Sequence, residues 1–371
     1  MKIKGRKETV ENDKTYKIKR KFLYKGDSLM VYIILYILLA VLCAWNIHFV
    51  AADMDVKIVM NRINKLRFIF AILIIFTHCT LPYKYLPHIL FPLRKISTFG
   101  VGYFFILSGY GLAYSVANKP NYLDHFGKKI GNLLWITIFS SVASTLIKNL
   151  VLGWNEPLTL INWYMPAIIA LYLIFYVVFR VFSQSKNLRN LCLTCAVFAG
   201  ILIVLYFDNF TGNNYRNYYI SELAFPFGVL IYEYADLISR FLKKKYAIFL
   251  VIMAEIIFGG IAFSVPERGL LDLIFHNLML VPVGFVLILL MNKIEINNLI
   301  LKTMNRYTMF IYLFQFPVLM ILKNYYQTKE RPFDVFFFLA CLGFTCILAV
   351  IIQIIYDRVG MMVNTCFHSN D

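Results

Sequence analysis

Long apolar runs recur along the chain and are separated by short polar and basic stretches. Runs of about 18 to 24 residues are long enough to cross a hydrocarbon core roughly 30 Å thick as helices. Unbroken runs, rather than segments of alternating polarity, favour an all-α fold over a membrane barrel. The pattern predicts a polytopic integral membrane helical bundle with eleven spans. These are residues 29–50, 67–81, 98–117, 130–151, 163–182, 190–207, 218–236, 246–265, 270–291, 307–323 and 333–356.

The loops between these runs are short, so no soluble domain is expected within the membrane domain. A basic N-terminal tail at 1–28 precedes an extra hydrophobic segment at 29–51. That segment is too long for a signal peptide and has no small-residue cleavage site at its end. A ten-span core at 61–358 and a short C-terminal tail at 359–371 complete the predicted organisation.

Composition excludes a water-soluble globular protein, because 60% of the residues are hydrophobic and only 15% are charged. The net charge of +17 resides mainly in loops and the N-terminal tail, where it is expected to set membrane topology rather than to bind nucleic acid. Seven cysteines fall mostly in apolar segments, including Cys192 and Cys195. We interpret them as small apolar residues rather than as a redox or metal pair.

The distribution of basic residues predicts an orientation. If the loop before Arg67 is cytoplasmic, the loops on that side hold 18 Lys and Arg and the opposite loops hold nine. This bias predicts that the ten core spans start and finish in the cytoplasm. Ten further basic residues precede Leu29, and one additional span would place them outside. Either residues 29–50 do not cross fully, or the tail is translocated despite its charge.

Arg67 and His78 are the strongest functional candidates. Ionisable groups within membrane spans are energetically costly, so their presence indicates a function. Eleven positions on a helix rotate by about 1100°, which is three turns plus roughly 20°, and rise about 16 Å. The two side chains therefore share one helical face, with Arg67 at the cytoplasmic end. On composition alone, a histidine near the end of a span is more often a polar residue bonded to a neighbouring backbone.

Four motifs follow that pair in a recognisable order. Phe-Gly-Val-Gly-Tyr-Phe-Phe-Ile-Leu-Ser-Gly-Tyr stands at 99–110, and Asn-Trp-Tyr-Met-Pro-Ala at 162–167. Phe-Pro-Phe-Gly-Val-Leu follows at 225–230, and Arg-Tyr-Thr-Met-Phe-Ile-Tyr-Leu-Phe-Gln-Phe-Pro at 306–317. Together with Arg67, ten mostly apolar residues and His78, this order resembles the membrane acyltransferase 3 family. The resemblance extends over the core at 61–358.

The resemblance implies an integral membrane O-acyltransferase of the cell membrane. Such an enzyme moves an acyl group, commonly acetyl, from cytoplasmic acyl-coenzyme A to a hydroxyl of a cell-surface or lipid-linked glycan. The resemblance also implies that His78 is the catalytic residue. A neutral imidazole is a suitable base for a sugar hydroxyl. Arg67 lies where a phosphate-rich donor would arrive, and its guanidinium suits bidentate phosphate contacts. The expected partners are the acyl-coenzyme A co-substrate, a hydroxyl acceptor and the bilayer, without a permanently bound cofactor or metal.

Two positions depart from the family pattern. Where relatives often carry an Arg-x-x-Arg pair, this chain has Lys128 and Lys129, with Asn132 at the second Arg position. These lysines either contact donor phosphates or only satisfy the positive-inside rule. Gln315 stands where many relatives carry His, and a glutamine can hydrogen-bond a sugar but cannot exchange protons near neutrality.

Several polar or aromatic positions are weaker candidates for lining an acceptor site. Ser108 adjoins a stripe of small residues that favours close helix packing, and this interpretation is at least as plausible as a catalytic role. Trp163 and Tyr164 belong either to an interfacial aromatic belt or to a sugar-stacking surface. Glu255 and His276 lie inside spans, where ionisable groups are rare.

Two other classes of protein fit the same pattern. A carrier for lipid-linked sugars or small metabolites would be favoured by inverted internal repeats, and no convincing duplication is visible. In a receptor or structural membrane protein, His78 and Arg67 would merely pack or pair. The sequence leaves the acceptor, the acyl length and the oligomeric state open.

Overall fold

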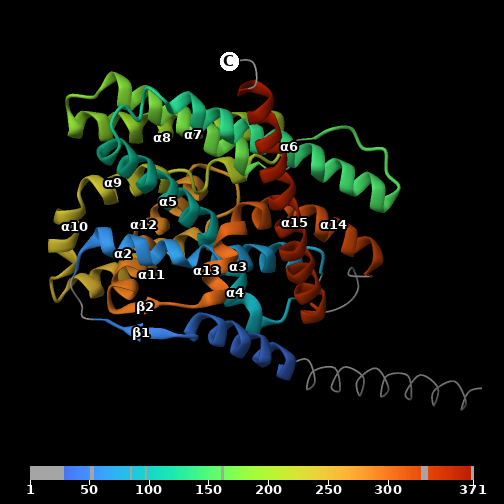
Figure 1. Cartoon of the computed structure of the whole chain (residues 1–371). Coiled ribbons are helices and arrows are strands. Elements are labelled where there is room, and N and C mark those ends of the chain that lie inside the picture. The colour runs from blue at the N-terminus through green and yellow to red at the C-terminus, as the bar shows by residue number, and fades with distance from the viewer. Residues whose placement is uncertain are drawn as a thin grey trace, which may run out of the picture.

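The structure is a computed structural model that describes residues 29–50, 54–83, 86–96, 98–159, 163–326 and 333–368. The predicted basic tail at 1–28 lies outside the described residues. Most of the described chain is helical (Figure 1). An unlabelled helix, Leu29–Ala44, comes first. The labelled elements are β1 (Ile47–Phe49), α2 (Val56–Ile63), η1 (Asn64–Leu66), α3 (Arg67–Thr80), η2 (His88–Leu90), α4 (Phe91–Ile96), α5 (Thr98–Asn118), α6 (Phe126–Leu152), α7 (Tyr164–Val181), α8 (Lys186–Thr211), η3 (Arg216–Tyr218), α9 (Ala224–Glu233), α10 (Ala235–Leu242), α11 (Ala247–Ala262), α12 (Leu270–Lys293), β2 (Ile294–Ile296), α13 (Leu299–Met304), η4 (Asn305–Tyr307), α14 (Thr308–Tyr325) and α15 (Val335–His368).

Each predicted core span corresponds in position to a helix, but the predicted count of ten spans is not confirmed. Among the described residues, six helices are long and apolar enough to cross a membrane. The number rises to seven if α10 and α11, which meet at a bend of 100°, count as one span. The difference arises from short helices such as α3, whose 14 residues rise only about 21 Å.

The extra N-terminal segment is not confirmed as a span either. Its helix ends at Ala44, and the chain turns at Asn46, which has a φ of 59°. The following strand β1 pairs antiparallel with β2, with Ile47 opposite Ile296. The backbone therefore leaves the helix to join a two-stranded sheet, at the bottom of the view in Figure 1.

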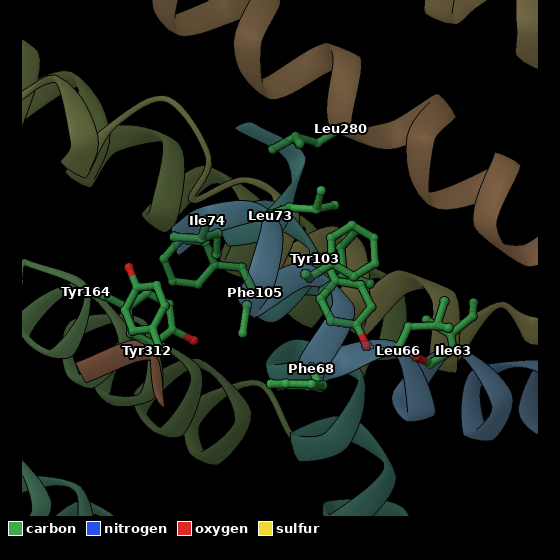
Figure 2. Packing of buried hydrophobic residues seen from close by; sticks show 14 of the residues in the cluster. Ile63, Leu66, Phe68, Leu73, Ile74, Tyr103, Phe105, Tyr164, Leu280 and Tyr312 are labelled. Carbon is green, nitrogen blue, oxygen red and sulfur yellow. Dashed lines mark hydrogen bonds between the residues drawn. The ribbon is translucent and has the colours of Figure 1, made fainter. Parts of the chain in front are cut away.

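The short helix α3 lies inside the bundle, packed against α4, α5, α14 and α15. Ten of its 14 residues are buried. A helix that is apolar on all sides is stable when protein surrounds it, so α3 need not match the thickness of the bilayer. Figure 2 shows Phe68, Leu73 and Ile74 of this helix among aromatic side chains of α5, α7 and α14.

α3 and α14 run parallel and side by side. The side-chain oxygen of Asn305 accepts a hydrogen bond from the backbone amide of Phe68 at 2.8 Å. Ten residues later on both helices, His78 contacts Gln315. Asn305 also donates to the backbone oxygen of Lys65 at 2.7 Å, so it holds the chain just before and just after Arg67.

Two glycines let α5 and α9 approach to backbone contact. A Cβ at Gly109 would lie 2.0 Å from the backbone oxygen of Phe225. A Cβ at Gly228 would lie 2.1 Å from the backbone oxygen of Ile106. Close packing is therefore the observed role of the glycine beside Ser108, as the stripe of small residues indicated.

Candidate active site

His78 lies near the C-terminal end of α3 and is half-buried. Its Nδ1 is 3.0 Å from Oε1 of Gln315, which is 1% exposed on α14. The ring of Phe316 packs against the imidazole with 4.4 Å between centroids. The histidine therefore bonds to a side chain of a neighbouring helix rather than to local backbone.

The hydrogen bonds of Gln315 define which imidazole nitrogen carries the proton. Its Nε2 donates to the backbone oxygen of Tyr312 at 2.9 Å, which leaves Oε1 facing His78. A carbonyl oxygen can only accept, so Nδ1 of His78 must be the donor. In the neutral imidazole, Nε2 then carries the lone pair and is the atom able to take a proton.

A cavity of about 580 Å³, which we call the His78 cavity, opens beside this imidazole. It combines apolar walls with basic, hydroxyl and amide side chains. Its lining comprises Ile74, Thr77, His78, Leu81, Phe91, Arg94, Lys95, Thr98, Val101, Trp163, Arg216, Asn217, Ile220, Ser221, Phe263, Glu267, His276, Met279, Leu280 and Tyr312.

A second cavity of about 300 Å³, the Arg67 cavity, lies toward the other end of α3. It is lined by Asn64, Arg67, Phe104, Leu107, Ser108, Gly111, Leu112, Ser115, Tyr122, Lys129, Tyr164, Tyr172, Thr308, Met309 and Tyr312. Tyr312 lines both cavities. Its ring packs edge-on against that of Tyr164, with 5.0 Å between the ring centroids. Both side chains are labelled in Figure 2. The two cavities therefore approach each other at Tyr312.

The guanidinium of Arg67 retains capacity for an anionic ligand. Its Nε donates to the backbone oxygen of Asn64 at 3.3 Å, and no carboxylate within the described part of the chain forms an ion pair with it. The side chain is half-buried, which reduces screening by solvent. Lys129 also lines the Arg67 cavity, so Arg67 and Lys129 together place two positive charges in its wall.

Arg67 lines a third cavity, of about 630 Å³, at the same end of the molecule. Lys65 and Lys302 add positive charge there, together with several asparagines. Lys65 donates to Glu295 at 2.7 Å, and this hydrogen bond lowers the pKa of the Glu295 carboxyl. Arg67 therefore lines both the Arg67 cavity and this larger recess.

The structure brings most of the sequence candidates to one of the two cavities. Ser108 and Tyr164 line the Arg67 cavity, where the hydroxyl of Ser108 lies close to those of Tyr164 and Tyr172. Ser108 does not line the His78 cavity. Its tyrosine partners favour a structural or ligand-positioning role over nucleophilic attack.

Two other candidates line the cavity at the opposite end of α3. Trp163 and His276 line the His78 cavity, although the sequence places them on different helices. By contrast, Glu255 on α11 lines none of the three cavities, and neither does the exposed Lys128. Within the described residues, no group of three His, Cys, Asp or Glu side chains could hold a metal ion.

Sequence reasoning missed an ion pair that forms part of the wall. Asp272, which is fully buried, accepts from Nε and Nη2 of Arg216 at 2.7 and 2.8 Å. Its carboxylate also lies 2.9 Å from Nδ1 of His276. The spacing of four residues between Asp272 and His276 was the available signal, since such residues share a helical face.

The comparison with known families agrees with this geometry. The chain matches the family model described as an acyltransferase domain, Acyl_transf_3, over residues 60–354. The protein therefore belongs to the acyltransferase 3 family and is a membrane acyltransferase. No curated protein and no solved structure matches the chain.

Proposed function

We propose that the protein is an O-acyltransferase that moves an acyl group, in the simplest case acetyl, from cytoplasmic acyl-coenzyme A to a hydroxyl of a cell-surface or lipid-linked glycan. The observation that carries this proposal is the pair of cavities at the two ends of α3, which share Tyr312 as a lining residue. One presents Arg67 and Lys129, and the other presents the imidazole of His78.

The donor is assigned to the Arg67 cavity. Coenzyme A carries its phosphates at one end and its thioester at the other, so a basic entrance and a neutral, aromatic interior suit it. Arg67 and Lys129 would contact the phosphates, and Tyr312 would lie beside the thioester at the junction. Asn305 acts indirectly, because it anchors the backbone on both sides of Arg67.

The acceptor is assigned to the His78 cavity. Nε2 of His78 takes the proton from the acceptor hydroxyl as that oxygen attacks the thioester carbonyl. The tetrahedral intermediate collapses by breaking the carbon–sulfur bond, and the imidazolium returns the proton to the departing thiolate. The products are the acyl ester and free coenzyme A, and His78 is neutral again. Gln315 holds the ring in the required tautomer and orientation.

The test is release of free coenzyme A from acetyl-coenzyme A by the purified protein in lipid vesicles, with and without a crude glycan extract. We expect release to be stimulated by the extract and abolished in folded His78→Ala. His48→Ala is a matched control, because His48 is exposed on β1 and lines none of the three cavities. Equal release by wild type and His78→Ala would remove His78 from the mechanism. Absence of release from the wild type would favour the carrier alternative.

A further inference from the structure

The His78 cavity is unusually basic for a site that would take a neutral sugar. Arg94 and Lys95 of α4 and Arg216 of η3 all line it, and Glu267 is the one acidic residue among the lining residues that the structure describes. Lys95 is close enough to Arg94, Arg216 and Glu267 for the charge of each to act on its ammonium, by repulsion from the two arginines and attraction to the glutamate, so these side chains form one cluster. When the buried carboxylate of Asp272 is included, the described side chains of the cluster still carry three positive charges against two negative ones.

The cluster contains elements of defined geometry. Asp272 holds two guanidinium nitrogens of Arg216 and is itself inaccessible, so Arg216 is fixed in the cavity wall. The ammonium of Lys95 lies 4.0 Å from the ring centroid of Phe263, another lining residue. Cations that are positioned in advance bind an anion with a smaller loss of conformational freedom.

Two further lining residues fit a saccharide. The hydroxyl of Ser221 is buried, with the residue 4% exposed, and has no hydrogen-bond partner in the described structure. A buried hydroxyl without a partner is unfavourable, so the hydroxyl of Ser221 is available to hydrogen-bond a polar group that enters the cavity. The half-buried Trp163 offers an aromatic surface in the same cavity.

We propose that the acceptor is an acidic saccharide, which carries a carboxylate or phosphate close to the hydroxyl that is acylated. The anion would bind to the cluster of Arg94, Lys95 and Arg216, and a sugar ring would lie toward Trp163 and His78. This inference rests on the proposed function for the role of the cavity, but the binding that it requires is measurable without any reaction.

The experiment measures binding to the protein in phosphatidylcholine nanodiscs. The probes are a labelled oligosaccharide of alternating glucuronate and N-acetylglucosamine, its carboxyl-reduced form, and an oligosaccharide of similar length bearing glycerol phosphate. We expect at least one charged probe to bind about tenfold or more tightly than the reduced form, with an advantage that shrinks as salt is added. The better charged probe identifies whether carboxylate or phosphate is preferred.

The double variant Arg94→Gln, Lys95→Gln should lose this advantage. Lys323→Gln is the matched control, because Lys323 is exposed at the end of α14 and lines neither the His78 nor the Arg67 cavity. Equal binding of charged and reduced probes, or no binding of any probe, would overturn the inference. So would loss of the charge preference in nanodiscs containing phosphatidylglycerol, since the cluster would then serve a lipid headgroup.

Release of coenzyme A in the same samples separates the two proposals. Tight binding of a charged probe without release would support the acidic ligand and contradict acyl transfer to it. Release that is equally fast with charged and reduced probes would support acyl transfer and contradict the acidic acceptor.

Discussion

Gln315 holds Nδ1 of His78 at 3.0 Å while its own amide nitrogen is occupied by the backbone oxygen of Tyr312. This arrangement leaves Nε2 of His78 as the only ring nitrogen that can act as a base. Gln315, which stands where many relatives carry His, is therefore placed to orient His78. A glutamine cannot exchange the proton, but it can fix the tautomer.

Replacing Gln315 with leucine tests this relationship. We expect kcat to fall by about 10- to 100-fold with little change in KM, because an unfixed imidazole spends less time in the productive orientation. Gln315→His should restore part of the rate, since an imidazole nitrogen can accept the same hydrogen bond. Steady-state kinetics of acyl transfer provide the measurement. A rise in KM alone would show that Gln315 contacts a substrate instead.

Replacing Arg67 with glutamine should weaken donor binding. A hydrogen bond to a charged group contributes about 1.5–3 kcal/mol, so KM for acyl-coenzyme A should rise about 10- to 100-fold. Arg67→Lys should be intermediate, because an ammonium retains the charge but not the bidentate geometry. An unchanged KM in both variants would contradict the assignment of Arg67 to the donor.

Replacing Gly109 with alanine should destabilise the helix pair α5–α9. The added methyl would meet the backbone of Phe225, which cannot move aside as a side chain can. Overpacking of this kind costs about 1–3 kcal/mol, and the midpoint of thermal unfolding in detergent should fall accordingly. Gly343→Ala on α15 is the control, because a Cβ there meets nothing within 4 Å. Equal effects of the two substitutions would show that the close approach is not required.

The orientation of the bundle is testable with paired cysteines. Asn61 is exposed near the Arg67 end, and Lys323 is exposed near the opposite end of α14. In intact cells, Asn61→Cys should resist a membrane-impermeant thiol reagent and Lys323→Cys should react, after native cysteines are shown not to react. The reverse result would exchange the donor and acceptor sides.

The positions of the helices were predictable from the sequence, whereas their relation to the bilayer was not. α3 begins at Arg67, where the predicted span begins, and ends one residue before the predicted end. Hydropathy cannot distinguish a helix that faces lipid from one that is enclosed by other helices, because both are apolar. For this reason the number of spans was not predictable, although the apolar segments were.

The site was predictable only as far as its residues followed local patterns. Arg67 and His78 were found because charge within an apolar segment is conspicuous. The contacts of Asn305 with Phe68 and of Asp272 with Arg216 join residues far apart in the sequence. Such tertiary contacts leave no periodic signal in a single sequence, and the fixed position of Arg216 in the wall of the His78 cavity depends on its contact with Asp272.

The most direct test of the central claim is chemical rescue of folded His78→Ala. Acyl transfer from acetyl-coenzyme A to the best acceptor should fall by about 100- to 10,000-fold in this variant. Added imidazole should restore part of that rate, because the cavity of about 580 Å³ has room for it beside residue 78. It should have no such effect on the wild type. Transfer by His78→Ala at the wild-type rate would contradict the account.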